Sequence, residues 1–307
     1  MTEKKLVFTL LVFTAAAAAI FLGIRQVIAK RTVAQDGENI PTIIPELATT
    51  SYLGILPLYE EASIQSDLNS GHGVSYLIRT DTATLLLDIG NNPEQDEIAP
   101  FMQNMQALGI DWAEINRIVI SHLHPDHVGG LTAWRKQTID FGELPGGIGD
   151  RLVFVPAEVS MKGAIHATIP TLPAPDVATT GAMAYLEPWP LSLRKPIGYE
   201  QALVIHVAGQ GLVLITGCGH PTLETLVTRA ETLYDVPVMA VIGGLHYESA
   251  TAEDVQPDIQ TLQDKNPSLV ALSPHDSSME ALEAFKTAFP GTYQMLQVGE
   301  AIQFTGD

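Results

Sequence analysis

Residues 121–130 read SHLHPDHVGG and bring three histidines (His122, His124 and His127) and one aspartate (Asp126) into six consecutive positions. They directly follow a short apolar run that predicts a buried strand. Imidazole nitrogens and carboxylate oxygens are the usual ligands of catalytic zinc sites. Side chains at i and i+2 after a strand end, here His122 and His124, can converge on one ion. Asp126 and His127 can then turn toward a second ion about 3.5–4 Å away. The spacing therefore predicts a metal site, and the alternative is a solvated loop that is rich in histidine by accident.

The composition fits a globular protein with a substantial core. The chain has 307 residues, of which 46% are hydrophobic and 17% charged. These proportions exclude a disordered or collagen-like chain. Its one cysteine, Cys218, excludes an intrachain disulfide and a cysteine-rich zinc module.

Charge is distributed unevenly along the chain, whose formal net charge is −19. Residues 1–31 contain five basic residues and one acidic residue, so the remaining 276 residues carry 11 basic and 34 acidic ones, a net charge of −23. A nucleic-acid-binding surface needs clustered positive charge. Nucleic acid is therefore excluded as a partner, and we expect a small-molecule substrate. The sequence does not decide the oligomeric state.

The amino terminus is strongly apolar. Residues 6–24, LVFTLLVFTAAAAAIFLGI, contain no charge, and at about 1.5 Å per residue they can span a bilayer. We expect residues 1–31 to anchor the protein in a membrane, with 32–50 as a linker and 51–307 as a catalytic domain. A cleaved signal peptide and a buried helix of a soluble protein are the alternatives. Basic residues flank both ends of the apolar run, and because short amino-terminal anchors usually precede an exported body, we expect a periplasmic or extracytoplasmic catalytic domain.

The body alternates between strand pairs and strand–helix units. The pattern predicts a layered α/β domain with two sheets inside and helices outside. A capping box from Ser277 to Glu280 is expected to start the last helix, and residues 157–199 are expected to form a long functional loop. The strands are expected at 73–79, 84–88, 117–121, 152–155, 202–207, 211–216, 238–242 and 269–273, and the helices at 96–108, 223–234 and 253–263.

The histidine-rich stretch resembles the metal-binding signature of the metallo-β-lactamase superfamily. Further segments resemble its dihydropterin aminobenzene-phosphate synthase-like branch, and the likeness extends from about Gly71 to Phe304. The segments that carry it are LDIG (87–90), EQAL (200–203), GLVLITGCGHP (211–221), IGGLH (242–246), SPH (273–275) and VG (298–299). The resemblance implies an αββα four-layer sandwich of two mixed β-sheets flanked by helices, here preceded by the membrane-spanning helix.

The resemblance also implies a ligand set. The first ion would be held by His122, His124 and His220, and the second by Asp126, His127 and His275. Cys218 stands where many members carry a bridging aspartate, so it is either a ligand or an inert buried thiol. His246 would be a ligand, a proton donor to the leaving group or a structural residue. Asp88 would orient a ligand imidazole, and His72 is expected to be only a turn residue.

A hydrolase is the function that this resemblance implies. Two divalent ions, zinc first and manganese or iron as alternatives, would supply a metal-bound hydroxide that attacks a small ester, lactone or phosphodiester, with Asp126 and His246 as the catalytic side chains. The alternatives are a dihydropterin aminobenzene-phosphate synthase-like enzyme and a metal-binding module without catalysis. Departures from the branch pattern count against the synthase: Gly219, Thr222, the segment SPHD (273–276) and the pair Val155-Pro156. His124 in place of a glutamate counts against a di-iron reductase.

Overall fold

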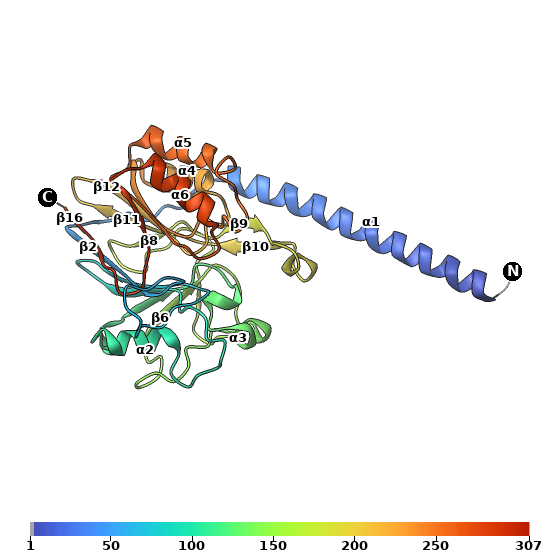
Figure 1. Cartoon of the computed structure of the whole chain (residues 1–307), viewed down its shortest axis with the longest axis horizontal. Helices are drawn as coiled ribbons and strands as arrows, with labels where there is room; N and C mark the ends of the chain where they lie inside the picture. The colour runs from blue at the N-terminus through green and yellow to red at the C-terminus, as the bar shows by residue number, and fades with distance from the viewer. Residues whose placement is uncertain (1–2, 307) are drawn as a thin grey trace. The chain divides into compact units, whose positions relative to one another are not determined.

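Two seven-stranded sheets form the frame of the computed structural model, which describes residues 3–306 (Figure 1). Contacts divide the chain into two units. The body comprises residues from Ile40 to Met183 and from Tyr199 onward. The amino-terminal unit comprises the residues up to Asn39 together with Ala184–Gly198.

The first sheet of the body has the strand order β16-β2-β3-β4-β5-β6-β7. Its first four strands pair antiparallel, and β4 to β7 pair parallel. The carboxyl ends of β4 and β5 therefore lie at one edge of the sheet. The strands are β2 (Tyr52–Tyr59), β3 (Ser75–Arg79), β4 (Thr84–Leu87), β5 (Arg117–Val119), β6 (Leu152–Val155), β7 (Ile165–His166) and β16 (Ile302–Thr305).

The second sheet has the order β1-β11-β12-β13-β14-β15, with β8 also paired to β11. β11 and β12 form an antiparallel hairpin, and β12 to β15 pair parallel. The strands are β1 (Thr49–Thr50), β8 (Ala178–Thr179), β11 (Leu203–Val207), β12 (Gly211–Thr216), β13 (Val238–Gly243), β14 (Leu269–Leu272) and β15 (Tyr293–Met295).

Alternating apolar side chains explain why these strands form a sandwich. In β4, Leu85 and Leu87 join the core between the sheets, while Leu86 faces the outer layer. In β12, Val213 and Ile215 join the central core, while Leu214 belongs to the opposite outer cluster. Successive side chains of a strand point to opposite faces, so each sheet is apolar on both faces and requires cover on both.

Helices supply that cover. The first sheet carries α2 (Pro100–Ala107) and α3 (Leu131–Lys136), and the second carries α4 (Leu223–Tyr234), α5 (Gln256–Lys265) and α6 (Met279–Ala288) (Figure 1). The predicted αββα four-layer sandwich is thereby confirmed.

Some element boundaries differ from the prediction. α2 begins at Pro100 rather than at 96, because proline is favoured in the first helical turn. The expected capping box is replaced by Ser278, whose Oγ accepts from the Ala281 N–H at 3.0 Å. The predicted long loop, 157–199, contains four short strands.

The amino-terminal unit contains α1 (Glu3–Glu38) and most of a hairpin formed by β9 (Met183–Leu186) and β10 (Ile197–Glu200). The connection between these strands includes η3 (Leu191–Leu193). α1 is long and apolar enough to cross a membrane, and its most apolar part, with a mean hydropathy of 1.9, is unburied. Its apolar residues surround the helix rather than forming one stripe. The segment expected as a linker from residue 32 remains helical to Glu38.

Candidate metal centre

The predicted ligands come from separate loops at the carboxyl ends of parallel strands. η2 (Pro125–His127) follows β5, and Cys218, His246 and His275 follow β12, β13 and β14 respectively. Ligands and substrates of open α/β sheets characteristically bind at this end of the strands. The structure brings all seven predicted metal ligands into this region.

One group of possible ligand atoms comes from His122, Cys218 and His220, which all lie within 4.8 Å of one another. His124 lies beside this group, and its ring centroid is 4.5 Å from that of His122 and 4.9 Å from that of His220. The three imidazoles predicted for the first ion are thus adjacent.

A second group comprises His127, Cys218 and His275, again within 4.8 Å. Oδ2 of Asp126 lies 3.0 Å from Nε2 of His275 and 3.5 Å from Nε2 of His127. The three residues predicted for the second ion therefore face a shared space.

Cys218 belongs to both groups. Its side chain is buried, and Sγ lies 3.2 Å from Nε2 of His127. Burial alone would raise the pKa of this thiol, but the charges of His127 and His275 and hydrogen bonds hold it well below the ordinary value. The sulfur is thus located as a bridging ligand would be, and a thiolate suits such a position.

Asp88 fixes the orientation of His127. Its Oδ2 accepts from Nδ1 of His127 at 2.7 Å and from Oγ of Ser121 at 2.6 Å, and its Oδ1 accepts from the Ser121 N–H at 2.7 Å. The proton on Nδ1 leaves the Nε2 lone pair of His127 directed toward Cys218 and Asp126. Asp88 therefore occupies the supporting position that the sequence suggested.

Glu200 supports His220 in the same way, a role that the sequence did not reveal. The fully buried carboxylate accepts from Nδ1 of His220 at 2.7 Å and from the backbone N–H groups of Cys218, Gly219 and His220 at 3.1, 2.7 and 2.9 Å. Burial would raise its pKa, but these hydrogen bonds and the charge of His220 lower it to about 2. The sequence signal was its place in the EQAL segment (200–203), which carries the family resemblance but assigns no role to the carboxylate.

His246 lies at the more open side of the site. Its ring centroid is 4.4 Å from that of His220, and Nδ1 lies 3.6 Å from Oδ2 of Asp276. The nearby Asp276 carboxylate and the Cys218 sulfur raise its pKa to about 10, against the opposing effect of burial. About a quarter of its side chain is exposed, so it can reach a bound substrate.

His72 does more than form a turn. Its Nε2 lies 3.5 Å from Oδ2 of Asp126, and its Nδ1 lies 3.1 Å from Oε1 of Glu61. His72, Asp126, His275 and Asp276 form a further group whose ligand atoms lie within 4.8 Å. Gly73 permits this approach, because a Cβ at its φ of +126° would lie 2.3 Å from the Asp126 carbonyl oxygen. His72 lies in a bend, as expected, and its side chain also lies at the rim of the metal centre.

The donor set fits divalent metal ions, with one adjustment at His275. Imidazole, carboxylate and thiolate together suit zinc. Nε2 of His275, a candidate donor atom, is buried without a hydrogen bond. Nδ1 of His275 accepts from the Gly73 N–H at 3.1 Å, so a neutral ring carries its proton on Nε2. Coordination through Nε2 requires the other tautomer, in which protonated Nδ1 no longer accepts from the Gly73 N–H and instead faces Oε1 of Glu61, 3.6 Å away.

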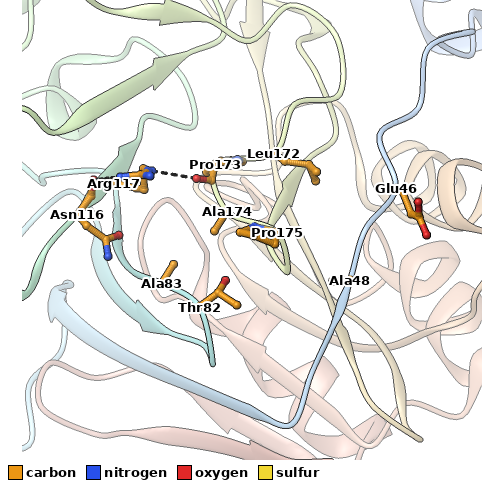
Figure 2. Close-up of a pocket in the computed structure, with 10 residues that line it drawn as sticks. All are labelled: Glu46, Ala48, Thr82, Ala83, Asn116, Arg117, Leu172, Pro173, Ala174 and Pro175. Atoms are coloured by element: carbon orange, nitrogen blue, oxygen red, sulfur yellow. Dashed lines mark hydrogen bonds between the residues drawn. The ribbon is translucent and has the colours of Figure 1, made fainter.

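A separate pocket of about 460 Å³ lies at the opposite ends of the strands (Figure 2). It is lined by residues that precede β4 and begin β5, including Thr82, Ala83 and Arg117, whose Nε donates to the Pro173 carbonyl at 3.0 Å. Since the candidate ligands follow these strands, this pocket is distinct from the metal centre.

Comparisons with known proteins agree with this geometry. The family model of the metallo-beta-lactamase superfamily matches residues 68–242. The 7,8-dihydropterin-6-methyl-4-(beta-D-ribofuranosyl)-aminobenzene-5'-phosphate synthase of Methanocaldococcus jannaschii is 25% identical over 283 residues, covering 79% of this chain and 93% of that protein.

Solved structures share the fold. A metal-dependent hydrolase of the beta-lactamase superfamily matches with a TM-score of 0.58 at 20% identity, covering 82% of this chain and 99% of that one. A metallo-beta-lactamase fold protein of Bacillus subtilis, YhfI, matches with a TM-score of 0.51 at 13% identity, covering 83% and 100%.

Proposed function

Because the chain belongs to the metallo-beta-lactamase superfamily and gathers its candidate ligands into adjoining groups, we propose that it is a dinuclear metal-dependent hydrolase. The observation that carries the proposal is Cys218, which lies within 4.8 Å of possible ligand atoms in both groups. A shared ligand would hold two ions at the short separation that dinuclear hydrolysis requires.

The residues divide into two ligand sets and their supports. His122, His124 and His220 would hold one ion, Asp126, His127 and His275 the other, and Cys218 would lie between them. When bound, such ions lower the pKa of water and polarise the scissile group. Asp88 and Glu200 keep the protons of His127 and His220 on Nδ1, so that both rings offer Nε2 to the metal side.

His246 is the proposed proton donor to the leaving group. It is partly exposed, lies beside His220 and has the Asp276 carboxylate 3.6 Å from its Nδ1. A neighbouring carboxylate favours the protonated imidazole, which is the form that a general acid must have before the bond breaks.

The proposed substrate is a small ester, lactone or phosphodiester. The acidic body repels extended polyanions at long range, whereas two divalent ions, zinc first and manganese or iron as alternatives, can attract a single phosphate or carboxylate. This test compares the zinc-loaded protein on bis(p-nitrophenyl) phosphate, a small lactone, a p-nitrophenyl ester, a cephalosporin and single-stranded RNA. Metal-dependent turnover of a small substrate is expected, and rapid RNA cleavage alone would contradict the proposal.

A second candidate is the activity named for the Methanocaldococcus jannaschii relative, supported by a match over 93% of that protein. Gly219 and Thr222, which flank His220, depart from the branch pattern and argue against it. A direct assay of that synthase reaction, run beside the hydrolysis panel, separates the two. The third candidate is a metal-binding module without catalysis. In that case the protein should bind metal but show no turnover in either assay.

We further propose that α1 anchors the protein, with the catalytic body exported. Its support is the length and apolar character of the helix. Full-length protein should remain in the membrane fraction after an alkaline wash, and deletion of residues 1–31 should release it. An intact chain found in the soluble fraction would refute the anchor, and a mature protein beginning near Gln35 would indicate a cleaved signal.

A further inference from the structure

We propose that the tip of the β9–β10 hairpin, residues 187–196, is a second membrane contact that lies in the headgroup region of the bilayer crossed by α1. The proposal rests on the membrane anchor and is independent of the catalytic activity.

Hydrogen bonds connect the hairpin to one face of α1 at two positions along the helix. At its base, the Ala184 N–H donates to Oδ2 of Asp36 at 2.7 Å. At its tip, the guanidinium of Arg25 donates to the carbonyl oxygens of Leu193 and Arg194 at 3.3 and 3.4 Å. Between these positions Ala29, which is on the same helix face, is only 1% exposed. The hairpin therefore extends along about 16 Å of the helix, with its tip toward the amino-terminal, apolar part.

The tip lies where the apolar run ends. Residues 6–24 carry no charge, and their helical length of about 28 Å matches a hydrocarbon core of about 30 Å. Arg25 is the first charged residue after that run. If this run crosses the hydrocarbon core, Arg25 lies at the membrane surface, and the backbone that it holds at Leu193 and Arg194 lies there too.

The exposed side chains of the tip suit that location. Trp189 is 79% exposed and Leu193 is 54% exposed, which is costly for a loop surrounded by water. Tryptophan is enriched at membrane interfaces, and basic residues near the surface attract anionic lipids. Arg194 and Lys195 are adjacent and exposed, in a chain whose last 276 residues contain only 11 basic ones. The tip thus combines an aromatic residue, an aliphatic residue and a pair of positive charges.

The two contacts act together. A single helix leaves its flanking segment free to rotate about the helix axis. The hairpin tip, bonded to the same helix, adds apolar and charged groups on one side of it. The amino-terminal unit is therefore expected to engage the membrane on a defined face.

Tryptophan fluorescence of the full-length protein provides the test. The protein is inserted into vesicles of phosphatidylcholine and phosphatidylglycerol whose acyl chains are brominated near the headgroups. Of the three tryptophans, Trp112 is buried in the body and Trp134 serves as the control. Bromine quenches only neighbouring rings, so wild type and Trp134→Phe should both lose emission in brominated vesicles relative to unbrominated ones. Trp189→Phe should abolish most of this loss.

A charge variant supplies the second measurement. Arg194→Gln combined with Lys195→Gln alters exposed side chains only, so folding should be preserved. In anionic vesicles it should reduce the quenching of Trp189, and in pure phosphatidylcholine it should have little effect. The proposal is overturned if the chain fails to insert, or if Trp189 in the inserted protein keeps the red-shifted, unquenched emission of a ring in water.

Discussion

Glu200 accepts a hydrogen bond from Nδ1 of His220 at 2.7 Å while the same carboxylate accepts the N–H groups of residues 218–220. One buried side chain therefore sets both the backbone turn after β12 and the tautomer of a ligand histidine. Cys218 and His220 come from this turn, so the geometry of both ligand groups depends on Glu200.

Replacing Glu200 with glutamine should weaken metal binding while preserving most of the fold. Glutamine keeps the size of the side chain and one carbonyl oxygen, but it loses the charge that orients His220. Supporting residues of this kind typically change metal affinity by about 10–100-fold. Competition with a chromophoric chelator measures the effect, and Glu143→Gln, at an exposed carboxylate, is the control. Unchanged affinity in Glu200→Gln would refute the assignment.

Glu60 should make stability fall as the pH rises. Burial raises the pKa of this carboxyl from 4.5 to about 7, although hydrogen bonds from Ser273 and Tyr76 act in the opposite direction. Between pH 4.5 and about 7, the folded state therefore keeps a proton on Glu60 that the unfolded chain has released. This proton's contribution to the free energy of unfolding is lost as the pH rises through about 7.

The measurement for Glu60 is the free energy of unfolding in urea across that pH range. Glu60→Gln cannot ionise at this position. Its free energy of unfolding relative to that of the wild type should therefore increase from about pH 5 to about pH 8. The variant retains an oxygen that can accept from the Tyr76 O–H, which bonds to Oε1 of Glu60 at 2.5 Å in the wild type. Parallel curves for the two proteins would show that Glu60 does not titrate in this range.

Asp126→Ala should abolish both the binding of one ion and the hydrolytic activity. Its Oδ2 lies close to both His127 and His275, so its loss leaves the second ion with fewer ligands, while the first group is untouched. The metal content measured by elemental analysis should fall from about two ions per chain toward one, and the circular dichroism spectrum should be unchanged. Asp150→Asn, an exposed position, should behave as wild type. Full activity and unchanged metal content in Asp126→Ala would contradict the ligand set.

The parts of the site that are local in sequence could be predicted, and the parts that depend on tertiary approach could not. His122 to His127 share one loop, so strand-end geometry alone indicates a metal site. His220 and His275 lie in loops that follow other strands and were identified through resemblance. The role of His72 depends on a loop that packs over Asp126 across more than fifty residues, a contact that no local spacing reveals.

The fold shows the same division. The continuous apolar runs of β4 and β12 predicted strands, and the sandwich follows because both faces of each sheet are apolar. The edge strands β15 and β16 were not predicted, because both are short. The residues of β15 are all half-buried, and the alternating burial of β16 extends over only Ile302–Thr305. The cap of α6 differed by one residue because Ser277 and Ser278 both have a hydroxyl, and Oγ of Ser277 donates to the His275 carbonyl instead.

Cys218→Ser distinguishes a bridging ligand from an inert buried thiol. A thiolate ligand gives cobalt-substituted protein an intense sulfur-to-metal charge-transfer absorption in the near ultraviolet, whereas a serine hydroxyl gives none. Because Sγ lies 3.2 Å from Nε2 of His127 and is shared by both ligand groups, we expect wild type to show this band, and Cys218→Ser to lack it and bind the metal pair more weakly. Cys218 is the only cysteine, so no other residue can produce the band. Its absence from wild type carrying two cobalt ions would show that Cys218 is an inert buried thiol.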